Sequence, residues 1–166
     1  MELPRLRIAV IGGATCDERR RRLAFETGRE IGRRAVLLCG GRGGVMAAAA
    51  EGARSVGGLT VGILPGGGAA ESPPNPHIQV PIYTGLGQAR NQVIVLSAHA
   101  IVAVGGSWGT LTEIAMAMKH GVPVVCLESW RPERPDGVRE ELLLQAATPA
   151  EAVGRAIAAV GGSEAT

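Results

Sequence analysis

Two glycine-rich segments of the chain have the composition of a binding site for phosphate or a similar anion. The first is Gly40-Gly41-Arg42-Gly43-Gly44, which has four glycines in five residues and joins an apolar run to an alanine-rich helical stretch. Glycine permits positive φ angles and close backbone approach, and free N–H groups at a helix start can hold a phosphate. A tight turn without a ligand is the alternative, but four glycines exceed what a turn needs.

The second segment joins another apolar run to a helix and reads Gly105-Gly106-Ser107-Trp108-Gly109-Thr110-Leu111-Thr112-Glu113. The backbone N–H groups around Gly105, Gly106, Ser107 and Gly109, together with the Thr110 hydroxyl, are expected to surround an anion. Gly13 follows the first apolar run and is added to the same set of binding residues, because it ends a strand in the same way.

Two charged residues near these glycines could act on a bound ligand. Glu113 is expected in the first turn of its helix, where it either faces the anion pocket or simply interacts with the helix dipole. Arg90 lies early in a helix whose sequence is otherwise suited to burial. A buried arginine needs an anionic partner, which is either a protein carboxylate or a ligand phosphate. Glu113 and Arg90 are therefore the candidate catalytic residues.

Several common kinds of site are excluded by residue type and spacing. Met46 stands where a dinucleotide fingerprint beginning at Gly41 needs its last glycine, and no acidic residue ends the second strand. A Walker A loop is absent, because Lys119 is the only lysine and lies elsewhere. The three cysteines and three histidines are scattered, so no metal site, disulfide framework or resident cofactor is expected.

The elements that must position these residues alternate along the chain between apolar strands and helices. Strands are predicted at Leu6–Ile11, Ala35–Cys39, Leu59–Leu64, Ile78–Ile82, Ala100–Val104, Pro123–Leu127 and Leu142–Gln145. Helices are predicted from an Asp17 cap to about Arg34, and at Val45–Val56, Gly85–Ser97, Leu111–His120 and from a Thr148 cap to about Val160.

Continuous apolar strands separated by helices indicate a mostly parallel sheet covered on both faces. The sequence thus predicts one doubly wound α/β domain of the Rossmann-like kind, with about seven strands in residues 1–160 and a flexible tail at 161–166. Three of the strand ends carry paired glycines, namely Gly12-Gly13, Gly40-Gly41 and Gly105-Gly106. Ligands of such sheets bind at the carboxyl ends of the strands, near the switch point, which is where these glycines are expected.

Composition limits the partners of the protein. A formal net charge of +2 on 166 residues is too small to indicate nucleic-acid binding. No apolar stretch is long enough for a membrane span, and the N-terminus leads directly into a strand rather than a signal peptide. The expected protein is cytoplasmic, with a small phosphate-bearing ligand and no nucleic-acid or membrane partner.

The second glycine segment resembles the P-G-G-x-G-T-x-x-E signature of the LONELY GUY family of cytokinin riboside 5′-monophosphate phosphoribohydrolases, long labelled lysine decarboxylase-like. The resemblance runs from Ile8 to about Val125 and includes the first glycine turn and an arginine matching Arg90. The sequence is nearest to a short bacterial branch of this superfamily and is also similar to the molybdenum cofactor carrier proteins. It departs from the hydrolase pattern at Gly105, Ser107, Asn91 and Thr112.

The resemblance implies a nucleotide-binding protein that cleaves the N-glycosidic bond of purine nucleoside 5′-monophosphates. Glu113 would stabilise the positive charge that develops on the ribose, and Arg90 would position the substrate. The alternative is a carrier without catalysis for a phosphate-bearing cofactor such as molybdopterin, and a ligand sensor or scaffold is a third option. Decarboxylation with pyridoxal phosphate is excluded, because Lys119 lies at the far end of its helix from the strand ends. A homodimer or higher oligomer is expected, because Val93–Leu96 is a run of four apolar residues.

Overall fold

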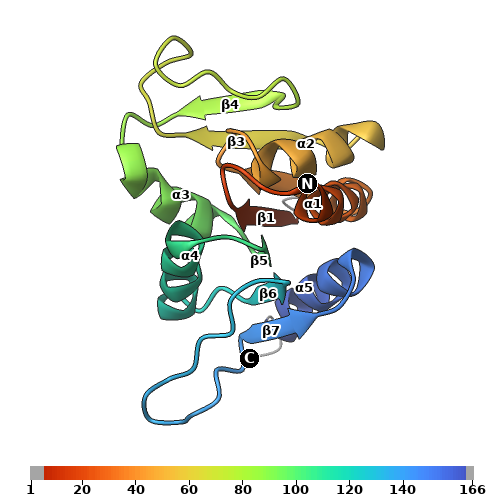
Figure 1. Ribbon diagram of the computed structural model, residues 1–166, viewed down its shortest axis with the longest axis vertical. Helices are drawn as coiled ribbons and strands as arrows, with labels where there is room; N and C mark the ends of the chain where they lie inside the picture. Colours follow the sequence, from red (N-terminus) through yellow and green to blue (C-terminus); the bar gives the residue numbers. More distant parts are fainter. Residues whose placement is uncertain (1–5, 164–166) are drawn as a thin grey trace, which may run out of the picture.

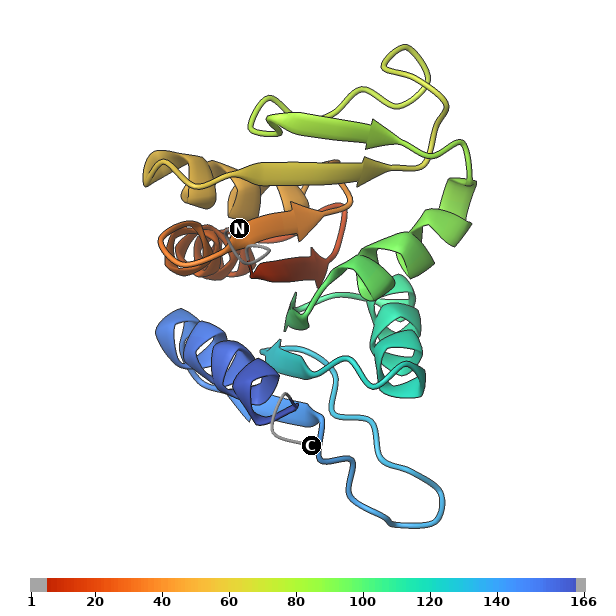
Figure 2. The ribbon, with the colours of Figure 1, turned by 180° about the vertical axis from the view of Figure 1, so that it is seen from behind.

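The computed structural model describes residues 6–163 as a three-layer α/β domain built on one parallel sheet. Helices α1, α2 and α5 cover one face of the sheet, and α3 and α4 cover the other (Figures 1 and 2). The chain runs through β1 (Arg7–Gly12), α1 (Glu18–Gly32), β2 (Val36–Cys39), α2 (Val45–Ser55), β3 (Thr60–Leu64), β4 (Val80–Tyr83), the 3₁₀ turn η1 (Gly87–Ala89), α3 (Arg90–Ser97), β5 (Ala100–Val104), α4 (Trp108–Lys119), β6 (Val124–Leu127), β7 (Leu143–Ala146) and α5 (Pro149–Ser163).

The strand order β4-β3-β2-β1-β5-β6-β7 confirms the predicted doubly wound sheet of seven strands. The chain builds outward from β1 to β4 and then returns to the other side of β1 with β5. The switch point therefore lies between β1 and β5. Because β2, β1 and β5 are neighbours, the glycine pairs at their carboxyl ends come together at the centre of one sheet edge.

The central strands are buried on both faces, which explains their continuous apolar sequences. In β1, Ile8 and Val10 pack toward α1, α2 and α5, while Ala9 and Ile11 pack toward α3 and α4. The alternation follows from the two-residue period of a strand. Each face thus has its own apolar core.

Helices α1 and α2 approach one another unusually closely because glycine lies at their contacts. A Cβ atom on Gly28 would lie 1.9 Å from the carbonyl oxygen of Ala49, and one on Gly52 would lie 1.9 Å from that of Phe25. No side chain fits at either distance. The N-terminal start of α1 is set by Asp17, whose carboxylate accepts a hydrogen bond of 2.8 Å from the Arg20 backbone N–H, as predicted for the cap.

Three helix boundaries differ from the sequence predictions. Helix α4 begins at Trp108, three residues before the predicted Leu111, so Glu113 lies in the second turn rather than the first. The predicted helix at Gly85–Ser97 is a 3₁₀ turn followed by an α-helix whose first residue is Arg90. Helix α5 continues to Ser163, so the first three residues of the predicted tail are helical, and 164–166 lie outside the described part of the chain.

No helix in the described part of the chain is both long enough and apolar enough to span a bilayer.

Candidate functional site

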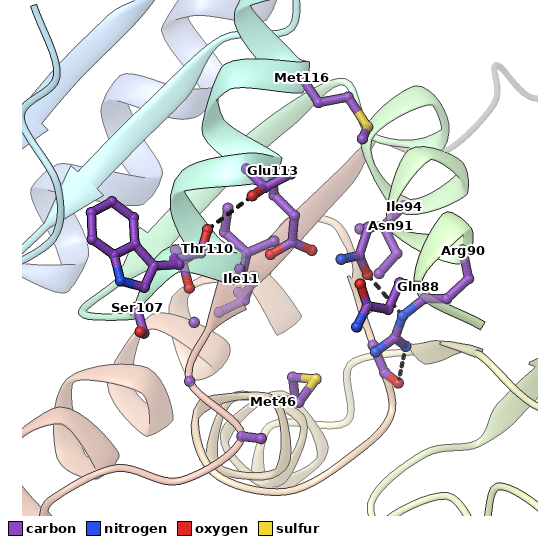
Figure 3. A pocket seen from close by; sticks show the side chains of 18 of the residues that line it. Ile11, Met46, Gln88, Arg90, Asn91, Ile94, Ser107, Thr110, Glu113 and Met116 are labelled. Carbon is purple, nitrogen blue, oxygen red and sulfur yellow. Dashed lines mark hydrogen bonds between the residues drawn. The ribbon is translucent and has the colours of Figure 1, made fainter.

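A cleft of about 830 Å³ opens at the carboxyl edge of the sheet, at the switch point (Figure 3). Its floor is the end of β1, and its two walls are the starts of α3 and α4. The lining residues are Val10, Ile11, Gly12, Gly13, Ala14, Gly40, Met46, Gln88, Ala89, Arg90, Asn91, Ile94, Ser107, Trp108, Gly109, Thr110, Thr112, Glu113 and Met116. A cleft of this size accommodates a nucleotide-sized ligand.

The structure divides the predicted site residues into two groups. Those that line this cleft are Gly13, Gly40, Arg90, Ser107, Gly109, Thr110 and Glu113. Those that lie outside it are Gly41, Gly43, Gly44, Gly105 and Gly106. The last two line a separate hollow with Arg20, Glu128 and Trp130.

The first glycine turn is close-packed against the protein itself. The Val45 N–H at the start of α2 donates a 3.0 Å hydrogen bond to the Gly13 carbonyl. A Cβ on Gly44, whose φ is 59°, would lie 2.3 Å from that same carbonyl oxygen. The loop after β1 therefore already occupies the start of α2, where this turn was predicted to hold an anion. Gly40 alone of these glycines borders the cleft.

The start of α4 presents unused backbone donors to the cleft. Its cap residue Ser107 makes no side-chain capping bond, and the first N–H of the helix bonded to the backbone is that of Leu111, which donates to the Ser107 carbonyl. Within residues 6–163, the N–H groups of Trp108, Gly109 and Thr110 form no hydrogen bond with another protein group. The positive end of the helix dipole adds to these donors, so the helix start favours an anion.

The loop that leads into α4 depends on glycine conformation. Gly106 has φ 99°, and a Cβ there would lie 2.2 Å from the Thr110 hydroxyl oxygen. The indole N–H of Trp130 donates a 3.0 Å hydrogen bond to the Ser107 carbonyl, and the Ser129 hydroxyl donates to the Gly105 carbonyl at 2.5 Å. Thus the role of Gly106 is to shape the loop, while Gly109 is the glycine that leaves open space at the helix start.

Arg90 is held by neutral acceptors instead of a carboxylate. Its guanidinium donates to the Gly40 carbonyl at 2.6 Å, to the Ile63 carbonyl, and to the Asn91 side-chain oxygen at 2.9 Å. No ion pair within residues 6–163 includes Arg90. Burial lowers the pKa of Arg90 from its usual value, and the nearby Glu113 opposes that shift. The arginine therefore carries a charge that no protein carboxylate within 4 Å neutralises.

Glu113 is the buried acid of the cleft. Only 8% of its surface is exposed, and its carboxylate reaches from α4 into the cleft (Figure 3). Burial raises the pKa of Glu113 to about 7, against a smaller opposing effect of Arg90. Within the described residues, the carboxylate makes no hydrogen bond or ion pair. At neutral pH this side chain is poised to hold or release a proton.

Apolar side chains complete the cleft and were missed by the sequence reasoning. Met46 from α2, Ile94 from α3 and Met116 from α4 line it, and Trp108 stands at its edge with 72% of its surface exposed. The Trp108 and Trp130 rings lie 5.2 Å apart. Ile94 in α3 and Met116 in α4 each occupy a helix position typical of ordinary core residues, so the sequence does not distinguish them as site residues. The exposed Trp108 lies within the second glycine-rich segment, and a large aromatic residue there was a sequence signal for a ligand site.

Comparison with known proteins assigns the chain to a family. The model of the SLOG cluster4 family matches residues 5–153, which is most of the sequence. The chain belongs to the SLOG cluster4 family. An uncharacterised protein of Archaeoglobus fulgidus is 44% identical over 124 residues, which cover 74% of this chain and 80% of that protein.

Two solved structures extend the similarity of this SLOG cluster4 protein to nearly its whole length. The molybdenum cofactor binding protein from Rippkaea orientalis is 30% identical with a TM-score of 0.83, covering 99% of this chain and 100% of that one. The molybdenum cofactor carrier protein from Chlamydomonas reinhardtii is 34% identical with a TM-score of 0.83, covering 96% and 99% of the two chains. The narrower resemblance to the LONELY GUY hydrolases stays a prediction.

The side chains of this SLOG cluster4 protein form no grouping of three or more His, Cys, Asp or Glu residues suited to a metal, as far as residues 6–163 are concerned. Lys119 is the last residue of α4, at the opposite end of the helix from the cleft. Cys39 lies behind the cleft, where burial raises the pKa of its thiol to about 11. The chemistry available in the cleft is therefore that of backbone N–H groups, a guanidinium, amides and one carboxyl group.

Proposed function

We propose that this protein binds a small phosphate-bearing ligand in the central cleft and acts in the cytoplasm as a carrier for a cofactor of the molybdenum cofactor type. One observation carries the proposal: the free N–H groups of Trp108, Gly109 and Thr110 open into the same cleft as the unpaired cation of Arg90. A phosphate supplies the negative charge that both features lack. The similarity to two molybdenum cofactor proteins over nearly the whole chain supports the choice of ligand class.

The cleft suits a ligand in which the phosphate is attached to an organic ring. The α4 start would take the phosphate, and the apolar side chains of Met46, Ile94 and Met116 would pack on the ring. Because the described residues include no metal-binding cluster, the protein would hold such a cargo by its phosphate and its organic part. The metal would travel as part of the cargo.

Binding and transfer test this proposal. Purified protein loaded with molybdenum cofactor should retain the cofactor through gel filtration and then restore activity to a cofactor-free molybdenum enzyme. A Gly109→Leu variant, with a side chain over the α4 start, should fold but lose retention. A wild-type protein that retains neither the cofactor nor any phosphate ester at millimolar concentration would rule the proposal out.

The second candidate is the phosphoribohydrolase activity that the sequence motif implies. Glu113 favours it, because a buried carboxyl group with a pKa raised to about 7 lies in the same cleft as Arg90. A carboxylate beside the ribose would stabilise an oxocarbenium-like transition state. Incubation with AMP and other nucleoside monophosphates, with detection of ribose 5-phosphate and free base, decides between turnover and storage. In an active enzyme, Glu113→Gln should lower kcat by about a hundredfold or more, a loss of roughly 3 kcal/mol in the transition state.

A further inference from the structure

Glu113 and the free donors of α4 lie on the same face of one helix. Gly109 and Thr110 precede Glu113 by four and three residues, which is the spacing of neighbours on a helix surface. Helical side chains lean toward the N-terminus, so the Glu113 carboxyl group lies over the turn that contains these two residues. Gly109 adds no side chain there, and a Cβ on it would meet no atom within 4 Å. An anion on the Gly109 and Thr110 N–H groups is therefore a direct neighbour of the carboxyl group.

The fold itself gives this carboxyl group no partner. Glu113 is only 8% exposed, yet no hydrogen bond or ion pair from residues 6–163 reaches its carboxylate. Arg90 faces it from α3 across the cleft, but the guanidinium N–H groups are directed to Gly40, Ile63 and Asn91. Figure 3 shows the Glu113 side chain pointing into the cleft, on the side of α4 that faces Gln88 and Asn91. The carboxyl group is thus available to the ligand.

Two anions in contact need a proton between them. An ionised carboxylate has only acceptor oxygens, and so has a fully deprotonated phosphate or sulfate. One shared proton turns this repulsion into a short, strong hydrogen bond. We infer that Glu113 makes the α4 anion site bind its oxyanion together with one proton, so that the site selects oxyanions that bring a proton with them. This inference rests on the proposed phosphate site.

Among residues 6–163, Glu113 is the only group in this part of the cleft that changes protonation between about pH 6 and 9, together with the ligand itself. The end of β1 contributes Ile11 and Gly12, and α2 contributes Met46, none of which titrates. From α3 comes the guanidinium of Arg90, a group that stays charged in proteins, and behind the cleft Cys39 stays neutral because its thiol has a pKa of about 11. The other residues of α4 in the cleft are uncharged. A pH dependence of binding in this range would therefore report the shared proton.

Inorganic phosphate and sulfate are matched probes for this proton. Both are tetrahedral and doubly charged in mildly alkaline solution, but only phosphate still carries a proton there. Glu113, with a pKa of about 7 in the free protein, is largely ionised at about pH 8.5. Phosphate can then donate its own proton to Glu113, whereas sulfate binds only after Glu113 has taken up a proton from water. The cost for sulfate grows about tenfold for each pH unit above the Glu113 pKa.

The binding of a phosphate monoester should depend on pH in a way intermediate between phosphate and sulfate. Its second pKa is about 6, so above neutral pH it has no proton to bring. It should bind well near and below pH 7, where Glu113 supplies the proton, and weaken at higher pH as sulfate does. A carrier that meets its cargo near neutral pH would therefore hold it with Glu113 protonated.

The experiment is titration calorimetry with inorganic phosphate, sulfate and ribose 5-phosphate at about pH 6 and about pH 8.5. Wild-type protein should prefer phosphate over sulfate by about 30-fold more at the higher pH than at the lower, and ribose 5-phosphate should weaken with sulfate. Glu113→Gln donates from its amide and needs no proton, so its sulfate binding should not weaken between the two pH values and its preference should change only as far as phosphate itself titrates. Its sulfate and ribose 5-phosphate binding should be restored at pH 8.5. Glu113→Asp keeps an ionisable group and should keep a pH-dependent preference.

The outcomes separate this inference from the proposed function. If wild-type protein binds phosphate and ribose 5-phosphate but the phosphate-to-sulfate ratio is the same at both pH values, the inference is wrong and the phosphate site stands. The same holds if Glu113→Gln keeps the wild-type pH dependence. If wild-type protein binds none of the three probes at either pH, the proposed phosphate site itself fails. Because sulfate itself does not titrate in this range, the change in wild-type sulfate affinity between the two pH values decides the question even if a variant does not fold.

Discussion

A leucine at Gly109 should close the anion site without damaging the fold. The structure leaves open space around a Cβ at this position, which is the second residue of α4 and lines the cleft. The leucine side chain would lean toward the helix start and cover the N–H groups of the first turn. A hydrogen bond to a charged group contributes about 1.5–3 kcal/mol, so losing two of them should weaken phosphate binding by about a hundredfold or more.

Gly154 provides the matched control. It also lies in a helix, in α5 on the far side of the sheet from α4, and a Cβ there likewise meets no atom within 4 Å. Replacing a helical glycine with leucine raises the free energy of unfolding by up to about 1 kcal/mol, so both variants should be at least as stable as wild type in urea unfolding. Calorimetry with inorganic phosphate should show binding lost in Gly109→Leu and unchanged in Gly154→Leu. A folded Gly109→Leu protein that binds phosphate normally would refute the placement of the anion at the α4 start.

Three further predictions concern stability and assembly. Gly28→Ala should lower the free energy of unfolding by about 2 kcal/mol or more, because its methyl group would overlap the Ala49 carbonyl between α1 and α2; an unchanged urea midpoint would contradict this close contact. Glu113 has a pKa of about 7 when folded and 4.5 as its ordinary value, so the folded state holds the proton more tightly and stability falls as pH rises from about 4.5 to about 7. Glu113→Gln should therefore be more stable than wild type at pH 8, by up to about 3 kcal/mol, and similar to it at pH 4, as measured by urea unfolding at each pH. The protein is predicted to sediment as a dimer or a larger oligomer at micromolar concentration. Of the apolar α3 run on which this prediction rests, Ile94 and Val95 are buried within the chain itself, and Leu96 is the strongly exposed residue.

The layered fold was predictable because its signals are local. Each buried strand is a continuous apolar run ended by glycine or a polar residue, and the Asp17 cap marks the α1 start. The start of α4 does not follow from the local pattern, because glycine is unfavourable in a helix and Gly109 is the second residue of α4. Packing overrides this preference: Trp130, from a segment more than twenty residues away, binds the Ser107 carbonyl and lies against Trp108.

The candidate site was only partly predictable, for a physical reason. Parallel strands put the three glycine pairs at one edge of the sheet, as predicted, but their adjacency depends on the order of β2, β1 and β5, which no sequence pattern indicated. The partners of Arg90 do not follow, because the Gly40 and Ile63 carbonyls come from distant strands and are chosen by side-chain packing. Nor could the sequence separate glycines that shape loops, such as Gly106, from one that leaves space, such as Gly109.

Together, the charged groups of Arg90 and Glu113 are stronger evidence for a ligand in the cleft than either residue is alone. A buried, unpaired charge is costly, and proteins usually place an opposite charge within hydrogen-bonding distance of it. Here the cation of Arg90 and the carboxyl group of Glu113 share one cleft, yet neither has such a partner among residues 6–163 and they do not pair with each other. An oxyanion at the α4 start would be attracted by Arg90 and, through one proton, hydrogen-bonded to Glu113. The same ligand would thus accept hydrogen bonds from the helix N–H groups, share a proton with Glu113, and bring Arg90 the opposite charge that residues 6–163 do not place within 4 Å of its guanidinium.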